Sequence, residues 1–259
     1  MKNKILYVSI IALLAGVTAF GGWKLWQECS EYKLGESAYT DIGQFADIPT
    51  EALKVEKPAD ETQSDECNSP AEDDAVWPQV DFAALAEINP DIVGWVYLEG
   101  TEIHYPIVQG NDNSYYLKHL FTGEWNSAGC IFMDSRNKGD FSERNTVIYG
   151  HHMKNNSMFS GLDGYKKQEF YDEHPTVLIL TPEKNFKLEV FSAYVANVEE
   201  SAWDLGFTVA GYEDWLEEIC GKSCVTSSVI PAVTDHVVTL STCSYEFSNA
   251  RFVVHGVLR

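Results

Sequence analysis

Basic residues are scarce in this sequence. Lys and Arg together number 18 against 39 Asp and Glu, which gives the 259-residue chain a formal net charge of -21. Proteins that bind nucleic acid need a basic face for the phosphates, so this charge argues against a nucleic-acid partner. The same excess of acidic groups disfavours electrostatic docking onto anionic lipid.

The sequence also lacks internal repeats and any His/Cys spacing typical of a zinc site, so we expect no metal and no cofactor. Its six cysteines are unevenly placed. A bridge between Cys220 and Cys224 requires some distortion of a helix end, and the alternative is two free thiols. Cys243 is a candidate site residue. The remaining cysteines are expected to be free or structural: Cys29, Cys67 and Cys130.

The long apolar run is ILYVSIIALLAGVTAFGG, residues 5–22, which is uncharged and about long enough to cross a bilayer core. Lys2 and Lys4 precede it, so the positive-inside rule predicts a cytoplasmic N-terminus and an extracellular remainder. The alternative is a cleaved secretory signal. The run exceeds the usual apolar core of such signals, and no small-x-small cleavage site is evident. Either interpretation exports the rest of the chain.

We therefore divide the chain into three parts. Residues 1–26 are predicted to form a cytoplasmic tip and a transmembrane signal anchor. Residues 27–76 are rich in acidic and small polar residues without periodicity, which predicts an extracellular stalk, because such a segment buries too little apolar surface to offset the entropy of ordering. Residues 77–259 are of ordinary size for a single domain.

The predicted domain is mainly β. Asp81 can cap a short helix that Asn89-Pro90 ends. Eight short strand-like segments follow with turn signals between them, and few helices are available as crossovers, so we expect an antiparallel barrel rather than a parallel sheet. These segments are residues 92–98, 103–109, 129–134, 146–150, 176–181, 186–196, 236–243 and 251–258. Two helical insertions are also predicted, at residues 158–171 and 209–219, each with an apolar stripe suited to core packing.

The pentapeptide TLSTC ends in Cys243, at the end of a predicted strand, and a seven-residue polar loop leads to a last strand that begins at Arg251. In such a hairpin the end of one strand faces the start of the next, so Cys243 and Arg251 should meet. The thiolate is a nucleophile, and the guanidinium can stabilise an oxyanion. Ser241 lies on the same strand face as Cys243 and should point into the same groove.

A base that activates the thiol is offered by the segment NTVIYGHHMKNNSMF. Its first residues form a short β-branched and aromatic run closed by Gly150, so His151 lies just past a strand end. His152 is the alternative. His255, which shares a strand face with Arg251, could approach the site, but a packed or surface position is the simpler interpretation.

Together these residues resemble the class B sortases, the cysteine transpeptidases that attach proteins to the Gram-positive cell wall. TLSTC is similar to the family's TLxTC nucleophile motif, and YGHHMKNNSMF to its histidine segment. The resemblance extends upstream to DFAALAEINPDIVGWVYLEGTEIHYPIVQGNDNSYYLKHLF and so covers roughly residues 81–259. It implies a closed eight-stranded barrel with added helices, in which the loop bearing the second helical insertion forms one wall of the substrate groove.

The resemblance also implies a reaction. Cys243 would attack the carbonyl of a Thr in the C-terminal sorting signal of a secreted protein, giving a thioacyl enzyme, and a cell-wall peptidoglycan amine would accept the protein. Arg251 would stabilise the oxyanion, with the backbone N–H of Ser244 as a second donor, and His151 would transfer protons. Glu246 would contact substrate or steer Arg251 or His151, although an exposed loop carboxylate is the simpler interpretation.

Two other function classes remain open from the residues themselves. A papain-type cysteine hydrolase needs its Cys near the start of a helix, whereas Cys243 ends a predicted strand. A non-enzymatic surface domain would use the barrel groove for binding alone and would not need the thiol.

Overall fold

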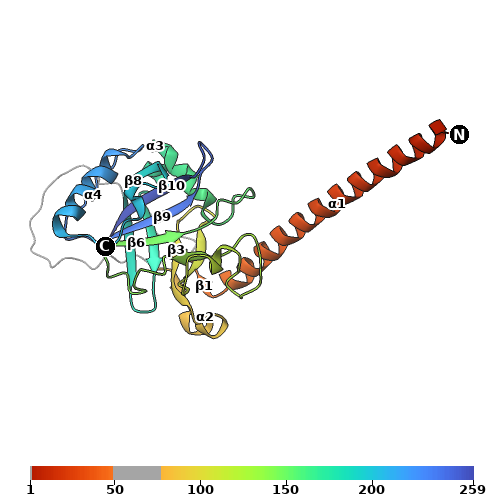
Figure 1. Cartoon of the computed structure of the whole chain (residues 1–259). Helices are drawn as coiled ribbons and strands as arrows, with labels where there is room; N and C mark the ends of the chain where they lie inside the picture. Colours follow the sequence, from red (N-terminus) through yellow and green to blue (C-terminus); the bar gives the residue numbers. More distant parts are fainter. Residues whose placement is uncertain (1, 49–76) are drawn as a thin grey trace, which may run out of the picture.

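The computed structural model describes residues 2–48 and 77–259 as a β-barrel from which one long helix extends (Figure 1). The long helix is α1 (Lys2–Gly43), and the short strands β1 (Ala46–Asp47) and β2 (Gln79–Val80) pair beside the barrel. The barrel strands are β3 (Ile92–Tyr97), β4 (His104–Val108), β5 (Ile131–Met133), β6 (Asn145–Tyr149), β7 (Thr176–Leu180), β8 (Asn185–Asn197), β9 (Val237–Cys243) and β10 (Ala250–Leu258). The other elements are α2 (Phe82–Ile88), η1 (Tyr115–Leu117), η2 (Phe159–Lys166), α3 (Gln168–Glu173), η3 (Ser201–Trp203) and α4 (Val209–Gly221).

The eight predicted strands are confirmed, and they close in the order β10-β8-β7-β3-β4-β5-β6-β9. The prediction that the barrel is antiparallel was wrong in two places, because β4 pairs with β5 and β6 pairs with β9 in parallel. Parallel neighbours need a long connection that returns the chain to the same end of the sheet. The connection from β4 to β5 carries η1, and the chain between β6 and β9 includes two whole strands, so neither connection needs a crossover helix.

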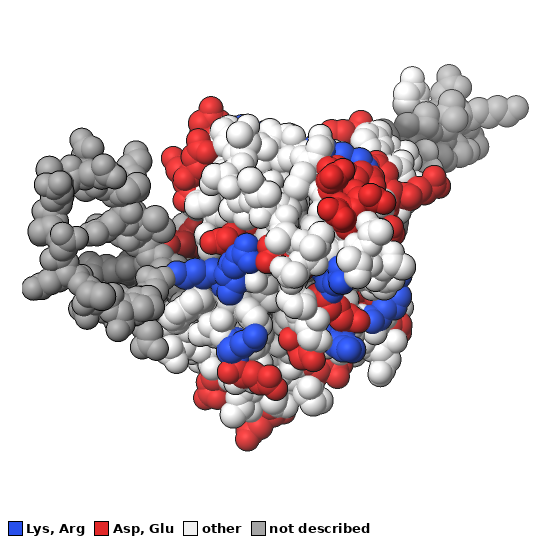
Figure 2. Space-filling model, turned by 90° about the vertical axis from the view of Figure 1, so that its left-hand side faces the viewer, with Lys and Arg blue, Asp and Glu red and all other residues white. Residues whose placement is uncertain are grey.

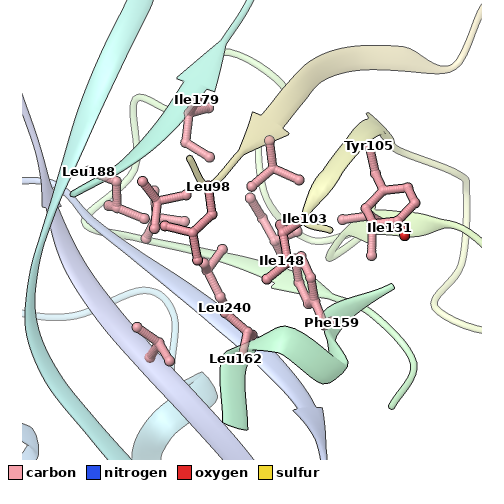
Figure 3. Close-up of a cluster of buried hydrophobic side chains, with 14 of the residues drawn as sticks. Leu98, Ile103, Tyr105, Ile131, Ile148, Phe159, Leu162, Ile179, Leu188 and Leu240 are labelled. Carbon is pink, nitrogen blue, oxygen red and sulfur yellow. The ribbon is translucent and has the colours of Figure 1, made fainter. Parts of the chain in front are cut away.

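The interior of the barrel holds the largest apolar cluster (Figure 3). Leu188 and Leu240 reach it from β8 and β9, and Ile148 from β6, while Phe159 and Leu162 of η2 pack against them from outside the strands. All five side chains are fully buried. The segment that follows the histidine doublet is therefore fixed to the barrel by two of its own apolar side chains.

The second half of α1 corrects the predicted stalk, which was expected to begin at Gln27. The helix continues to Gly43, and Ile42 is only 3% exposed against the barrel. The hydroxyl of Tyr39 donates to the Gly129 carbonyl at 2.5 Å, and Asn126 donates to the Glu31 carbonyl at 2.9 Å. Periodic aromatic and apolar residues within an acidic segment thus form a docked helix. The rest of the predicted stalk, residues 49–76, lies outside the described residues.

Within the residues that the structure describes, no helix has both the length and the apolar character needed to cross a membrane. On the face seen in Figure 2, Asp and Glu side chains lie at several places, with Lys and Arg between them.

The other helices largely follow the sequence. Asp81 caps α2 by accepting from the Ala84 N–H at 2.9 Å, as predicted. The second insertion forms α4, whose predicted apolar stripe of Tyr212, Trp215, Leu216 and Ile219 is buried against the outer face of β8, β9 and β10. Cys220 and Cys224 are free thiols, so the structure contains no bridge between them.

Candidate active site

Cys243 and Arg251 are brought together by the hairpin of β9 and β10. They are direct partners in the antiparallel register, so their side chains lie on the same face, as the sequence predicted. Residues 244–249 form the connecting loop, and Asn249 closes it with a positive φ of 62° that asparagine tolerates better than most residues. Both Cys243 and Arg251 are half-buried, and Arg251 Nη1 donates to the Ala250 carbonyl at 2.9 Å. Cys243 and Arg251 are therefore neighbours across the hairpin, and both are partly accessible to solvent.

His151 approaches Cys243 from the other side, through the parallel pairing of β6 with β9. Tyr149 is the register partner of Ser241, and the Gly150 N–H donates to the Ser241 carbonyl at 3.0 Å. Continuing this register by two residues sets His151 level with Cys243. A side chain at position 150 would crowd the core, because a Cβ there would lie 2.6 Å from Cγ of the fully buried Phe159 ring. The strand order thus places Cys243 between His151 and Arg251.

The ring of His151 is oriented by a backbone group at the end of η1. Its Nε2 lies 2.7 Å from the Leu117 carbonyl oxygen. A carbonyl oxygen only accepts hydrogen bonds, so Nε2 carries a proton and Nδ1 is the nitrogen left for proton exchange. Sequence reasoning missed Leu117, because a backbone acceptor leaves no signature in residue type.

His152 is directed elsewhere. Its Nε2 lies 2.9 Å from Asp163 Oδ2, and its ring meets Tyr245 edge-on with the ring centres 5.4 Å apart. The ring of His152 is thus held against η2 and Tyr245, whereas the strand register sets His151 level with Cys243. The geometry therefore favours His151 over His152 as the base.

A cavity of about 510 Å³ opens on the same face of the hairpin. Ser241 and Arg251 line it from the strands, and Cys243 is two residues beyond Ser241 and the register partner of Arg251. The opposite wall comes from the segment that enters the β8–β9 insertion, through Val198, Glu199, Glu200, Trp203 and Asp204. The first part of the insertion thus forms one wall of this cavity, while α4 itself packs on the core.

Trp203 connects this wall of the cavity to β9. Its indole N–H donates to the Ser241 hydroxyl at 3.0 Å, so Ser241 lines the cavity and already has a protein partner. Beneath Trp203, the buried Asn145 donates to the Asp204 carbonyl at 3.1 Å and accepts from the Thr239 hydroxyl at 2.7 Å. These bonds fix η3 and its tryptophan over the cavity.

A second guanidinium, that of Arg136, also lines the cavity. It forms a two-pronged pair with Asp134, at 2.9 Å from Nε and 2.8 Å from Nη2, and the Tyr149 hydroxyl donates to the same carboxylate at 2.9 Å. Burial alone would raise the pKa of Asp134, but the hydrogen bonds from Arg136, Asn113 and Tyr149 outweigh it and lower that pKa to about 2. Sequence reasoning missed this group, although the Asp-Ser-Arg spacing after a strand end was a usable signal.

The loop residues Ser244 and Glu246 differ from their predicted roles. The Ser244 N–H donates to the Ala250 carbonyl at 3.1 Å, so it is not free to serve as the second oxyanion donor. The hairpin itself uses that group to close its loop. Glu246 pairs with Lys166 at 2.7 Å and accepts from the Ser244 hydroxyl, so its contacts lie within the loop and η2 rather than at Arg251 or His151.

His255 is packed away from the site, as the simpler interpretation held. It is fully buried beneath α4 between the rings of Tyr194 and Trp215, and its Nδ1 lies 2.9 Å from the Thr239 hydroxyl. Because the Thr239 hydroxyl donates its proton to Asn145, His255 Nδ1 must be the donor in this pair.

Comparison with known proteins identifies this arrangement. The family model of the sortase domain matches residues 96–259. The chain belongs to the sortase family, in class B. Sortase B of Listeria monocytogenes is 33% identical over 253 residues, which cover 96% of this chain and 95% of the relative. Sortase B of Staphylococcus aureus is 39% identical over 176 residues, covering 67% and 72%.

Solved structures agree with this assignment. A Staphylococcus aureus sortase B–substrate complex superposes with a TM-score of 0.66 at 38% identity, covering 69% of this chain and 84% of that chain. A Bacillus anthracis protein similar to sortase B superposes with a TM-score of 0.65 at 40% identity, covering 70% and 83%. As a class B sortase the chain is a cysteine transpeptidase, so the papain-type hydrolase and the non-enzymatic surface domain are both set aside.

Proposed function

We propose that this sortase cleaves a C-terminal sorting signal of secreted proteins after a Thr and transfers the new carboxyl end to an amine of cell-wall peptidoglycan. The observation that carries the proposal is the strand order that sets Cys243 between His151 and Arg251. A relative solved with its substrate supports a groove of this kind as the place where the signal binds.

The reaction divides among the three side chains. The Cys243 thiolate attacks the Thr carbonyl, forming a C–S bond and a tetrahedral oxyanion beside the Arg251 guanidinium. His151 takes the thiol proton of Cys243 when the thiolate forms and gives it to the leaving amine as the C–N bond breaks, which leaves a thioester. The incoming amine then attacks that thioester and gives a proton to His151, and the thiolate leaves. Ser241, in the groove wall beside Trp203, would contact the backbone of the bound signal.

The proposed location is the outer face of the cell membrane. Residues 5–22 would anchor the chain with the N-terminus inside, as the preceding lysines suggest. The barrel would then lie outside, where secreted proteins and peptidoglycan are found. The docking of Tyr39 and Ile42 on the barrel supports a fixed connection between the anchor and the barrel.

The test is replacement of the nucleophile. Cys243→Ala should abolish cleavage of a fluorogenic sorting peptide and transfer to an amine acceptor, while the melting temperature stays near that of the wild type, because the side chain is half-buried and small. Cys220→Ala, which removes an exposed thiol on α4, is the matched control and should retain activity. A folded Cys243→Ala protein that still cleaves the peptide would remove the thiol from the mechanism.

A further inference from the structure

We propose that Lys166 is a positioning residue that holds the hairpin loop after Cys243 against the segment after His151. The inference rests on the proposed function, since it assigns to Lys166 the spacing of two catalytic groups that it does not touch. It also gives Glu246, which sequence reasoning placed at the substrate, a different role.

Lys166 is the last residue of η2 and connects two carboxylates from different parts of the chain. Its Nζ lies 2.9 Å from Asp163 Oδ1, one turn earlier in η2, and 2.7 Å from Glu246 Oε1 in the β9–β10 loop. The ammonium also lies 5.1 Å from the centre of the Phe252 ring on β10. One cation therefore joins η2, the loop and the strand that carries Arg251.

Each carboxylate uses its other oxygen to extend the connection toward the site. Asp163 Oδ2 lies 2.9 Å from His152 Nε2, and His152 directly follows His151. Glu246 Oε2 accepts from the Ser244 hydroxyl and from the Tyr245 N–H, and Ser244 directly follows Cys243. We name this series the Lys166 clamp; its members are His152, Asp163, Lys166, Glu246 and Ser244.

The clamp gives a reason for the histidine doublet. His151 lies level with Cys243 in the register of β6 and β9, while His152 pairs with Asp163 of η2. One histidine is therefore free to exchange protons, and the next one fixes its position. At the other end of the clamp, Glu246 is held in an equally well-defined position. The Lys166 ammonium, followed by the Ser244 hydroxyl, lowers the pKa of Glu246 to about 2, so this carboxylate remains charged throughout the neutral range.

The clamp is suited to positioning rather than to general stability. The side chains of Lys166, Asp163 and Glu246 are 30%, 38% and 43% exposed. Ion pairs this accessible to water contribute little to the free energy of unfolding. A displacement of about 1 Å between catalytic groups can nevertheless lower a rate about 100-fold. Loss of the clamp should therefore lower kcat and leave the melting temperature almost unchanged.

The experiment compares Lys166→Met with the wild-type full chain. We expect kcat on the sorting peptide to fall about 10- to 100-fold with little change in KM, because no clamp residue lines the cavity beside the hairpin. The melting temperature should change by less than about 4 °C. Lys166→Arg should recover most of the rate, since a guanidinium can also bridge two carboxylates. Glu246→Gln should lose as much as Lys166→Met, and the double variant no more than either.

Arg259 supplies the matched control. It also bridges two carboxylates, Asp235 at 2.7 Å and Glu189 at 3.4 Å, but at the far end of β10. Arg259→Met should leave kcat near the wild-type value. A wild-type rate in folded Lys166→Met and Glu246→Gln would overturn the clamp, and so would a rate loss of equal size in Arg259→Met.

A second measurement separates the clamp from the sorting reaction itself. The rate of alkylation of Cys243 by iodoacetamide, followed by peptide mapping across a pH series, reports on His151 beside the thiol without any substrate. Lys166→Met should shift this pH profile, and Arg259→Met should not. If the wild type cleaves no sorting peptide, the proposed substrate fails while this profile still decides the clamp: an unchanged profile in Lys166→Met overturns it.

Discussion

Replacement of His255 tests whether the core beneath the active-site hairpin contains a histidine that stays neutral. The side chain is fully buried, with Nδ1 on the Thr239 hydroxyl and rings of Tyr194 and Trp215 around it. Burial, assisted by the charge of Lys222, lowers the pKa of His255 to about 3. The perturbation we choose is His255→Asn, because an Asn amide nitrogen can take the place of Nδ1 as donor to Thr239 without titrating.

The sign and size of the effect follow from linkage. In the unfolded chain a histidine has a pKa of about 6.5, so it binds a proton as the pH falls below that value, while folded His255 does not. Stability is therefore lost as the pH falls from about 6.5 toward 3. At pH 5.0 the loss is about 2 kcal/mol relative to pH 7.5. Because pH 5.0 lies well above the folded pKa, this figure depends mainly on the unfolded state.

Urea unfolding at pH 7.5 and pH 5.0, followed by tryptophan fluorescence, measures the difference. The wild type should lose about 2 kcal/mol more than His255→Asn between these two conditions. The variant will be less stable at both, since Asn leaves space beside Trp215, but that cost does not depend on pH. His104, whose pKa is also lowered by burial, titrates in both proteins and cancels. Equal losses in the two proteins would show that His255 is protonated in the folded state and would refute the reasoning.

Two further predictions concern the site. His151→Ala should lower kcat by about 10²- to 10⁴-fold on a sorting peptide, as loss of an acid–base group does, whereas His152→Ala should lower it far less. The reverse ranking would show that His152, and not His151, transfers the protons. Arg251→Lys should lower the acylation rate about 10²- to 10³-fold with KM and melting temperature little changed, because Lys lacks the planar fork of donors. A near-normal kcat in a stable Arg251→Lys protein would remove this residue from the catalytic set.

The parts of the fold that depend on local pattern were predictable. Alternation and turn signals located all eight barrel strands, and helical spacing located α4 with its four buried residues. The docked half of α1 was not predicted, because acidic residues dominate its composition and hide the few contacts that matter, such as Tyr39 on Gly129. Average composition describes a solvated face well, but a helix needs only one apolar face to dock.

In the candidate site too, the features that depend on local sequence were predictable and those that depend on distant segments were not. Cys243 opposite Arg251 followed from a hairpin, which joins residues close in sequence. The sequence analysis missed Arg136, Trp203 and Lys166, because each of them belongs to an element far from the β9–β10 hairpin in the chain. Ser244 was assigned to the oxyanion because its N–H follows the nucleophile, but no residue type in the loop indicates that this N–H donates to the Ala250 carbonyl instead.

The parallel pairing that sequence reasoning missed is also what brings the base to the nucleophile. His151 follows the end of β6, and Cys243 ends β9. Were β6 and β9 antiparallel neighbours, the end of one would lie beside the start of the other. The seven residues of β9, at about 3.3 Å each, would then separate the imidazole from the thiol by about 20 Å. Parallel pairing sets the two ends level, and the antiparallel β10 adds Arg251 from its beginning. A barrel built only of hairpins between successive strands could supply the Cys–Arg pair but not the histidine, so this trio depends on one long-range strand pairing.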